Sequence, residues 1–363
     1  MKALFENTYI IAEAGVNHNG SSKLAFLLVD AAVDAGADAV KFQTFKAEAL
    51  VSEFAEKASY QKQATGSEET QFEMLRRLEL GHDLHHQLYK HCQDKDIEFL
   101  STAFDSESLR FLVGDLGLEK LKIPSGEITN APLVLEHART GCSLIVSTGM
   151  ATLSEVESVL GVIAFGLTTA RDVSPCREAF TRAYYSGAGQ EALRDKVTLL
   201  HCTTEYPAPS ADINLAAMDT LHQAFGLPVG YSDHSEGIAV SVAAVARGAR
   251  LVEKHFTLDK ALQGPDHKAS LEPADLKLLV DSIRSVEMAI GDGVKGPRPS
   301  EVKNMGVARK SLVAATDIAK GTVFSVDNLA IKRPGNGISP MEYWDILGSR
   351  SRFDFKKGEV IFD

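Results

Sequence analysis

Two histidines and two lysines stand at or beside the ends of short apolar runs in this 363-residue chain. His234 follows VGYSD, His255 ends LVEKH, and Lys41 and Lys122 lie in AVKFQ and LKI. A pair of imidazoles with open positions suits a borderline divalent ion such as manganese, cobalt, iron or zinc. Lysine ammonium groups, together with nearby hydroxyls, suit a phosphate and a carboxylate. The four residues therefore predict a metal-dependent site for an anionic substrate.

Bringing these side chains together requires a fold in which many strand ends meet. Eight β-rich runs alternate with amphipathic helical segments, which indicates a closed parallel (β/α)8 TIM barrel rather than an open doubly wound sheet. In that barrel the C-terminal ends of all strands form one active face. The predicted strands span residues 9–14, 39–43, 98–101, 120–123, 143–147, 197–201, 229–232 and 251–255.

The helical segments have recognisable ends. One helix is predicted over residues 22–35, because leucines and alanines recur at helical spacing until Gly36. Thr152 and Glu155 form a capping-box pattern, a third helix is predicted over residues 236–247, and a fourth begins at Pro273. The connections over residues 46–96 and 150–196 are long, so each is predicted to add a lid or an extra helix.

All eight predicted strand ends carry polar residues. Such groups cost about 1–3 kcal/mol each when they are buried without a partner. They must therefore share a ligand, a metal or one another. Besides the lysines and histidines, these residues include Glu13, Thr102, Ser125, Ser147, Thr204, Tyr206, Ser232 and Glu253.

Purely structural roles remain open at this stage for the same residues. Lys41 and Lys122 are also compatible with structural ion pairs at the rim. Glu13 and Glu253 are compatible with orienting a neighbouring lysine or histidine rather than reacting. A pair of histidines is by itself weak support for a metal site.

Composition narrows the class of protein. The net charge is −11, with 44% hydrophobic and 24% charged residues, which excludes a disordered chain and argues against a general nucleic-acid binder. No apolar run approaches the length of about 18 residues that spans a bilayer, so no membrane partner is expected. The four cysteines lack CxxC spacing, which favours reduced thiols and a cytoplasmic protein.

The C-terminal part of the chain differs in composition from the predicted barrel. Residues 1–290 are predicted to form the catalytic barrel, and residues 291–301, GDGVKGPRPSE, read as a linker. Residues 302–363 form a small module, with short β runs at 310–314, 323–324 and 329–332 and a helix near 340–347. Such a small module has a thin core and is expected to lean on another surface.

Several motifs in order resemble the sialic acid synthase family, the phosphoenolpyruvate-dependent nonulosonate synthases. They include IAEAGVNHNGS, AVKFQTF, LKIPSGEITN, LLHCTTEYPAP, GYSDHS, GPDHKASLEP and IKRPGNGIS. The resemblance covers nearly the whole chain. It implies a TIM barrel followed by a β-rich antifreeze-like (SAF) domain that is swapped between the subunits of a homodimer.

The resemblance also implies an activity. The expected reaction condenses phosphoenolpyruvate with the open-chain form of an N-acetylated mannosamine-type aldose and releases phosphate. N,N'-diacetyllegionaminate is favoured as the product over N-acetylneuraminate. The expected cofactor is a divalent metal, Mn²⁺ in the first place and otherwise Mg²⁺ or Co²⁺.

Site roles are carried over from the family residue by residue. His234 and His255 match metal ligands, and Glu13 matches a catalytic carboxylate. These three and the two lysines are the expected catalytic residues. The residues that match phosphoenolpyruvate contacts are Lys41, Thr102, Lys122, Ser125, Ser147 and Ser232. The sugar contacts are expected at Thr204, Tyr206, Asp266 and, from the partner subunit's SAF domain, at the position of Arg333; Thr204 departs from the asparagine of some members.

Two other functions compete with this one. Lys122 at a strand end is compatible with a Schiff-base aldolase or lyase. A non-enzymatic protein that binds carbohydrate or ice through its C-terminal module is the other alternative. Eight polar strand ends and the histidine pair favour the metal-dependent synthase over both.

Overall fold

The computed structural model describes residues 7–58, 61–62, 65 and 68–362. The outermost residues of both predicted domains, 1–6 and Asp363, therefore lie outside the described part. The chain divides into two compact units, Met1–Gly291 and Asp292–Asp363.

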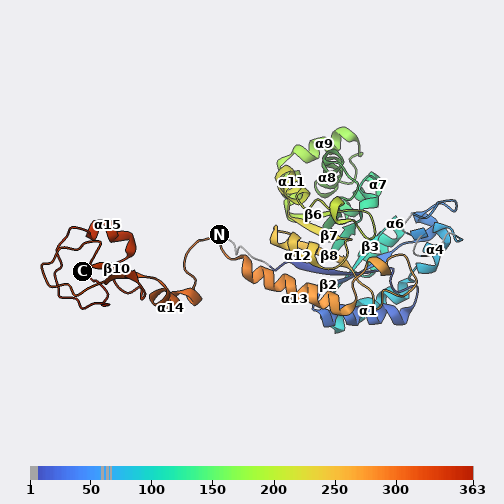
Figure 1. Ribbon diagram of the computed structural model, residues 1–363. Coiled ribbons are helices and arrows are strands. Elements are labelled where there is room, and N and C mark those ends of the chain that lie inside the picture. The colour runs from blue at the N-terminus through green and yellow to red at the C-terminus, as the bar shows by residue number, and fades with distance from the viewer. Residues whose placement is uncertain (1–6, 59–60, 63–64, 66–67, 363) are drawn as a thin grey trace. The chain divides into compact units, whose positions relative to one another are not determined.

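The first unit is a closed barrel of eight parallel strands in the order β1 to β8, as predicted, with helices outside the strands (Figure 1). Three predicted strands have the observed bounds, and the others run one or two residues further. The strands are β1 Tyr9–Gly15, β2 Ala39–Thr44, β3 Glu98–Ala103, β4 Lys120–Ile123, β5 Ser143–Ser147, β6 Val197–Cys202, β7 Val229–Asp233 and β8 Leu251–His255.

Helices and short turns connect these strands. The helices are α1 Ser22–Ala35, α2 Ala47–Leu50, α4 Gln71–Leu78, α5 His82–Asp94, α6 Ser106–Arg110, α7 Ala131–Arg139, α8 Leu153–Thr168, α9 Arg177–Tyr185, α10 Gly187–Lys196, α11 Ala217–Phe225, α12 Ala239–Ala246 and α13 Pro273–Ile290. The short 3-10 or π turns are η1 Phe111–Asp115, η2 Ser125–Glu127, η3 Ser210–Asp212 and η4 His267–Ala269.

Local sequence explains where these helices begin and end. At the start of α1 the Ser21 hydroxyl accepts a hydrogen bond from the Leu24 amide, and Gly36 ends the helix with φ +80°, a conformation that suits glycine. The predicted capping box of Thr152 and Glu155 is present at α8. Helix α12 begins three residues later than predicted, because Gly237 adopts φ +69° and interrupts the helical backbone.

Both long connections contain additional helices, as predicted. Helices α2 and α4 lie between β2 and β3 in addition to the crossover helix α5. Helices α9 and α10 follow α8 between β5 and β6, and both pack against α8.

The barrel interior has an apolar layer and a polar layer. The apolar layer is a packed cluster of Ile11, Ala39, Leu100, Ile145, Leu200 and Leu251. Alternate residues of a strand face the same side, so the residues two positions further along point inward as well. They are Glu13, Lys41, Thr102, Ser147, Cys202 and Glu253. The apolar layer therefore closes the barrel beneath a polar floor at its C-terminal end.

The C-terminal unit holds an antiparallel pair, β9 Ser311–Ala314 and β10 Leu329–Lys332, over a small core. It also contains α14 Pro299–Ala308, η5 Pro340–Glu342 and α15 Tyr343–Ile346. Helix α14 begins inside the predicted linker, because Pro299 occupies its first turn and Glu301 caps it through the Arg298 amide. The predicted strand at 323–324 is only one bridge, between Val323 and Arg350. Within the described ranges, no helix is long and apolar enough to cross a membrane.

Candidate active site

A cavity of about 240 Å³ opens at the C-terminal end of the barrel. It brings together twelve of the thirteen residues to which the sequence assigned a catalytic, metal-binding or substrate-binding role. They come from all eight strands or from the loops directly after them. These residues are Glu13, Lys41, Thr102, Lys122, Ser125, Ser147, Thr204, Tyr206, Ser232, His234, His255 and Asp266.

Two lysines and two glutamates form a buried network on the floor of this cavity. Lys41 Nζ lies 2.6 Å from Glu13 Oε2 and 3.5 Å from Glu253 Oε2, and it donates to Thr102 Oγ1 at 3.1 Å. Lys122 Nζ lies 2.7 and 3.0 Å from the two oxygens of Glu253. Opposite charges balance within this network, so an anionic ligand that binds the lysines competes with the carboxylates.

Burial and charge act in opposite directions on these groups. Burial alone raises the pKa of Glu253, but the ammonium groups of Lys122 and Lys41 outweigh it and hold this pKa well below its usual range. Burial raises the pKa of Glu13 above its usual range, even though Lys41 opposes the shift. Burial lowers the pKa of Lys41, but the charges of Glu13 and Glu253 prevail and raise it. The two carboxyl groups thus differ: Glu253 is a fixed anion and Glu13 is the one able to exchange a proton.

The two predicted metal ligands lie beside each other at the rim. The ring centroids of His234 and His255 are 5.6 Å apart. The Nδ1–H of His234 donates to the carbonyl of Thr203 at 2.6 Å, which leaves the lone pair of Nε2 available. Burial lowers the pKa of His234 to about 4 and that of His255 well below its usual value. Both imidazoles are therefore neutral at pH 7, as metal ligands must be.

The donor set fits a divalent ion that is only partly held by protein. Nδ1 of His255 is buried and has no hydrogen-bond partner among the described residues, and it lies 3.9 Å from Asp266 Oδ2. No group of three or more His, Cys, Asp or Glu side chains is arranged to hold a metal within the described part of the chain. Water and substrate oxygens would have to complete the coordination of an ion at this pair.

Several hydroxyls in the cavity are free to bind a ligand. Ser147 Oγ and Thr204 Oγ1 are buried without a hydrogen-bond partner among the described residues. Ser125 Oγ accepts a bond from the Gly149 amide at 3.0 Å. Any side chain at Gly149 would collide with Thr204 Oγ1, because an added Cβ would lie 2.4 Å from it. The cavity therefore contains unsatisfied donors beside a backbone that approaches closely, which is typical of an oxyanion-binding site.

The predicted sugar contacts are divided between the two units. The ring of Tyr206 lies 4.1 Å from the ring of His234, measured between centroids. Asp266 is almost fully buried, and burial raises its pKa to about 6. Arg333 lies in the C-terminal unit, where its Nε–H donates to the Ala308 carbonyl at 3.0 Å, so its contact with a sugar stays a prediction.

Two features of the cavity were not assigned from the sequence. Glu253 was left between a reactive and an orienting role, whereas the structure shows that it binds both lysines and accepts a hydrogen bond from Ser232 at 2.9 Å. Its position two residues before His255, on the same face of β8, was a usable signal. The other feature is a set of apolar side chains on one side of the cavity, most of them from α4 in the long connection after β2, and these residues carry no pattern that points toward the barrel mouth.

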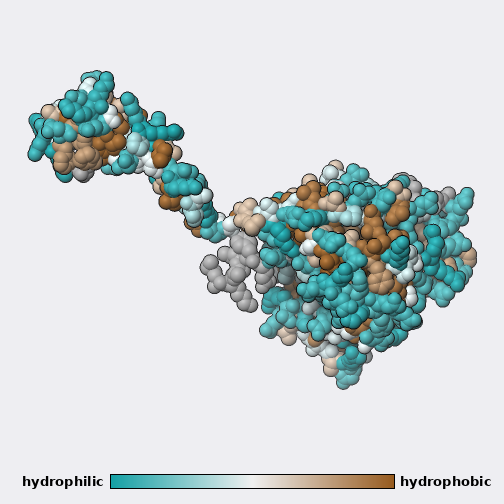
Figure 2. Space-filling view, turned by 90° about the horizontal axis from the view of Figure 1, so that it is seen from below, coloured by the Kyte–Doolittle hydropathy of each residue, from teal (hydrophilic) through white to brown (hydrophobic). Residues whose placement is uncertain are grey.

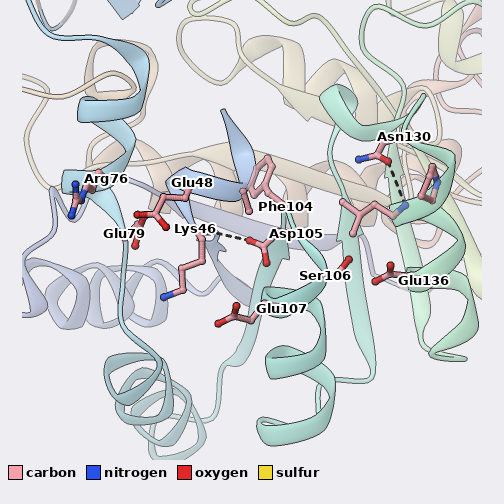
Figure 3. Close-up of a pocket in the computed structure, with 13 residues that line it drawn as sticks. Lys46, Glu48, Arg76, Glu79, Phe104, Asp105, Ser106, Glu107, Asn130 and Glu136 are labelled. Carbon is pink, nitrogen blue, oxygen red and sulfur yellow. Dashed lines mark hydrogen bonds between the residues drawn. The ribbon is translucent and has the colours of Figure 1, made fainter. Parts of the chain in front are cut away.

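A larger groove of about 860 Å³ lies outside the barrel mouth, between α4, the start of α6 and α7 (Figure 3). Its polar groups are largely engaged by the fold. Asp105 accepts a hydrogen bond from the Lys46 amide and caps α6, and Glu79 accepts one from the Ala47 amide. The groove contains none of the predicted site residues, so the smaller cavity is the candidate active site.

Comparison with known proteins shows the family to which the chain belongs. The NeuB family matches residues 28–295, and the SAF domain matches residues 309–363. The chain is 49% identical to the N,N'-diacetyllegionaminic acid synthase of Campylobacter jejuni, over 98% of this chain and 99% of that protein. It is 46% identical to the protein of the same name from Legionella pneumophila, over 97% and 93%. The solved N-acetylneuraminic acid (sialic acid) synthetase of Leptospira borgpetersenii, in complex with citrate, aligns with a TM-score of 0.66 at 34% identity, over 82% of this chain and 90% of that one. The chain therefore belongs to the NeuB family and ends in a SAF domain.

Proposed function

We propose that this protein is a nonulosonic acid synthase. It condenses phosphoenolpyruvate with the open-chain form of 2,4-diacetamido-2,4,6-trideoxymannose to form N,N'-diacetyllegionaminate and phosphate. The observation that carries the reaction is the convergence of two lysines and two neutral histidines on one cavity. The identity of 49% to a legionaminic acid synthase, against 34% to a neuraminic acid synthetase, supports the choice of sugar.

The floor of the cavity is suited to phosphoenolpyruvate. This substrate brings a phosphate and a carboxylate into a protein of net charge −11, so its binding needs local cations. Lys41 and Lys122 supply them, and the substrate takes the place of the carboxylates that now pair with the two lysines. The supporting hydroxyl groups belong to Thr102, Ser125, Ser147 and Ser232.

His234 and His255 would hold a divalent metal, manganese in the first place. The Thr203 carbonyl fixes the tautomer of His234, whose Nε2 lies 3.4 Å from Ser232 Oγ. Nδ1 of His255 has no hydrogen-bond partner among the described residues. When bound, such an ion supplies Lewis acidity toward an aldehyde oxygen.

The proposed reaction forms one C–C bond and breaks the C–O bond to phosphate. Carbon C3 of phosphoenolpyruvate donates an electron pair to C1 of the aldehyde, and the aldehyde oxygen takes up a proton and becomes a hydroxyl. Water adds to the cationic C2 and loses a proton, which leaves a hydroxyl on C2. The C2–O bond to phosphate then breaks, the hydroxyl proton passes to the leaving phosphate, and C2 becomes a keto group. Glu13 is the residue suited to accept the proton of that water, because its raised pKa makes it a better base than an ordinary carboxylate.

The SAF domain is proposed to act on the active site of a second subunit. We infer a homodimer in which this domain is swapped and delivers Arg333 to the sugar of the partner subunit. Met341, Trp344 and Phe353 are exposed on the C-terminal unit, where apolar side chains gather on the face seen in Figure 2. A small unit with exposed apolar side chains is stabilised when it docks on a second surface.

The buried cysteines Cys92, Cys142 and Cys202 are all free thiols, which supports a reducing compartment and hence the cytoplasm.

Phosphate release is the direct test of this function. Purified protein with Mn²⁺ and phosphoenolpyruvate is given 2,4-diacetamido-2,4,6-trideoxymannose or N-acetylmannosamine in parallel assays. We expect release with both sugars and a higher kcat/KM with the first. A higher kcat/KM with N-acetylmannosamine would make the protein a neuraminate synthase. An adduct on Lys122, trapped by borohydride, would replace the proposal with a Schiff-base mechanism, although the ion pair of Lys122 with Glu253 disfavours a nucleophilic amine.

A further inference from the structure

One side of the active-site cavity is apolar, in contrast to its charged floor. Five of its lining side chains belong to a single packed cluster, here called the apolar wall. Met74 and Leu78 are buried, and Leu75 and Phe104 are partly exposed. The apolar wall consists of Val16, Met74, Leu75, Leu78 and Phe104.

The topology places most of this wall across the barrel mouth from two of the predicted sugar contacts, Thr204 and Tyr206. Helix α4 belongs to the connection after β2, and Phe104 follows β3. Thr204 and Tyr206 follow β6, which lies on the opposite side of the closed eight-stranded ring. A sugar in the cavity is therefore held between polar groups on one side and aliphatic or aromatic carbon on the other.

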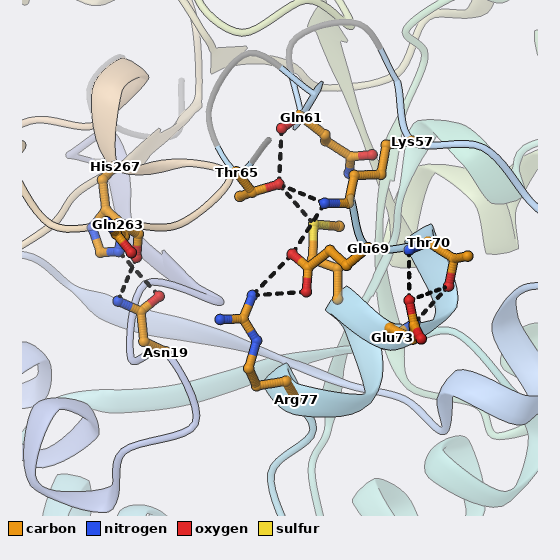
Figure 4. A network of polar contacts seen from close by, with 11 residues as sticks. Asn19, Lys57, Gln61, Thr65, Glu69, Thr70, Glu73, Arg77, Gln263 and His267 are labelled. Atoms are coloured by element: carbon orange, nitrogen blue, oxygen red, sulfur yellow. Dashed lines mark hydrogen bonds and ion pairs between the residues drawn. The ribbon is translucent and has the colours of Figure 1, made fainter. Parts of the chain in front are cut away.

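The helix that supplies most of the wall is held by a polar network that involves the segment before it (Figure 4). Lys57 Nζ lies 3.0 Å from Glu69 Oε1 and donates to Thr65 Oγ1 at 2.9 Å. Arg77, on α4 itself, reaches the same Glu69 oxygen at 3.1 Å, and the Thr65 hydroxyl lies 3.8 Å from Met74 Sδ. These contacts hold α4 at both its outer face and its inner face, so the wall is preorganised rather than a loose loop.

Side chains of α4 and of the residue after it line two different cavities. Arg76 and Glu79 point into the large outer groove seen in Figure 3, whereas Met74, Leu75 and Leu78 line the active-site cavity. Met74 and Leu78 are buried in the packed cluster, so the half-buried Leu75 is the side chain of α4 that offers apolar surface to a ligand in the cavity. The choice of apolar residues on this face thus points to an apolar part of the ligand.

The two candidate sugars differ in the property to which such a wall responds. Compared with N-acetylmannosamine, the diacetamido sugar carries a methyl group in place of the C6 hydroxymethyl and an acetamido group in place of the C4 hydroxyl. Both changes lie away from the reacting aldehyde at C1, which must meet phosphoenolpyruvate at the lysines. An apolar surface favours the methyl groups and leaves the extra hydroxyls of the other sugar without partners.

We infer that the apolar wall selects a 6-deoxy, doubly N-acetylated aldose over a more hydroxylated one, with Leu75 as the specificity-determining residue at its exposed part. This inference rests on the proposed synthase function. A hydrophobic pocket discriminates a missing methylene or an added hydroxyl by about 10- to 200-fold. Loss of one wall side chain is therefore expected to reduce the preference by about tenfold.

The test compares kcat/KM for the two sugars in wild type, Leu75→Gln and Leu75→Ala, with phosphate release as the readout. The ratio of the two constants is independent of the fraction of folded enzyme, so a partly unfolded variant still reports. We expect the ratio to fall about tenfold in both variants, while the KM for phosphoenolpyruvate changes little. Leu278→Gln on α13, where the leucine is exposed outside the cavity, is the matched control and should keep the wild-type ratio.

Three outcomes separate the two levels of the proposal. A wild-type enzyme that prefers the diacetamido sugar, together with Leu75 variants that keep its ratio, overturns the inference and leaves the function intact. Absence of phosphate release with either sugar in wild type overturns the function and the inference with it. A lowered ratio in the Leu75 variants but not in Leu278→Gln supports both.

Discussion

Changing both members of the Lys122–Glu253 ion pair is predicted to restore part of the lost stability but not the catalytic activity. The perturbation is a double-mutant cycle of Lys122→Met, Glu253→Gln and the double variant. Both side chains are buried, and Lys122 Nζ lies 2.7 and 3.0 Å from the two carboxylate oxygens. Each single change leaves one charge in the barrel interior with fewer partners, whereas the double change removes both.

The expected magnitudes follow from the partners that remain. Removing one member of a buried ion pair costs about 3–5 kcal/mol. In Lys122→Met the Glu253 carboxylate keeps Lys41 at 3.5 Å and the Ser232 hydroxyl at 2.9 Å, so we expect the lower end, about 3 kcal/mol. The double variant should recover about 2 kcal/mol of the summed losses, within the usual range of coupling between residues in contact.

Urea unfolding followed by far-UV circular dichroism measures these stabilities. The chain has one tryptophan, Trp344 in the C-terminal unit, so its fluorescence follows that unit rather than the barrel. The exposed pair Lys277 and Asp281, whose charged atoms are 3.5 Å apart, offers a control cycle with an expected effect below about 0.5 kcal/mol. Phosphate release should be strongly reduced in all three barrel variants, including the double variant.

Two results would refute this reasoning. A double variant whose loss of stability equals the sum of the two single losses would show that the two charges are not coupled in the folded protein. A double variant with wild-type phosphate release would show that Lys122 acts only as a structural partner.

Three further predictions concern the metal, the pH dependence and the dimer. Chelation of the metal should abolish phosphate release, and added Mn²⁺ should restore it. His234→Ala and His255→Ala should each weaken Mn²⁺ binding as measured by electron paramagnetic resonance. Unchanged Mn²⁺ binding in both variants would count against a metal site at these histidines. Burial lowers the pKa of His85 to about 4, so the folded state disfavours its protonation and stability should fall from about pH 6.5 towards pH 4. In His85→Gln the slope of unfolding free energy against pH should be shallower by up to about 1.4 kcal/mol per pH unit. Urea unfolding from pH 7 to pH 4.5 measures this slope, and an unchanged slope would refute the lowered pKa of His85. Mixed dimers of Arg333→Ala and Lys122→Ala chains should regain partial activity if the arginine acts on the partner's site, whereas activity no higher than that of either variant alone would oppose the domain swap.

The barrel was predictable because its strands end where apolar runs meet polar residues. The bounds of β4, β5 and β8 agree with the prediction, since each strand combines a short apolar run with a polar last residue or a following turn. The same periodicity places Glu253 and His255 on one inward face of β8. The convergence of the site therefore follows from alternation along each strand and closure of the ring.

Other features depend on tertiary contacts that the sequence pattern does not encode. Met74 and Leu75 lie in a long connection between β2 and β3, and only packing determines that α4 turns them toward the cavity. Pairing of Lys122 with Glu253 joins residues 131 positions apart, and residue type alone does not distinguish that pair from a ligand contact. Helix α14 was missed because its start, Pro299, lies in a stretch rich in glycine and proline that is typical of linkers.

The most direct test of the central claim is a crystal structure with Mn²⁺ and phosphoenolpyruvate bound, in which the ion is located by its anomalous scattering. The account predicts one manganese peak between His234 and His255, and phosphoenolpyruvate in the same cavity in contact with Lys41 and Lys122. A manganese ion elsewhere, or phosphoenolpyruvate bound away from both lysines, would contradict it.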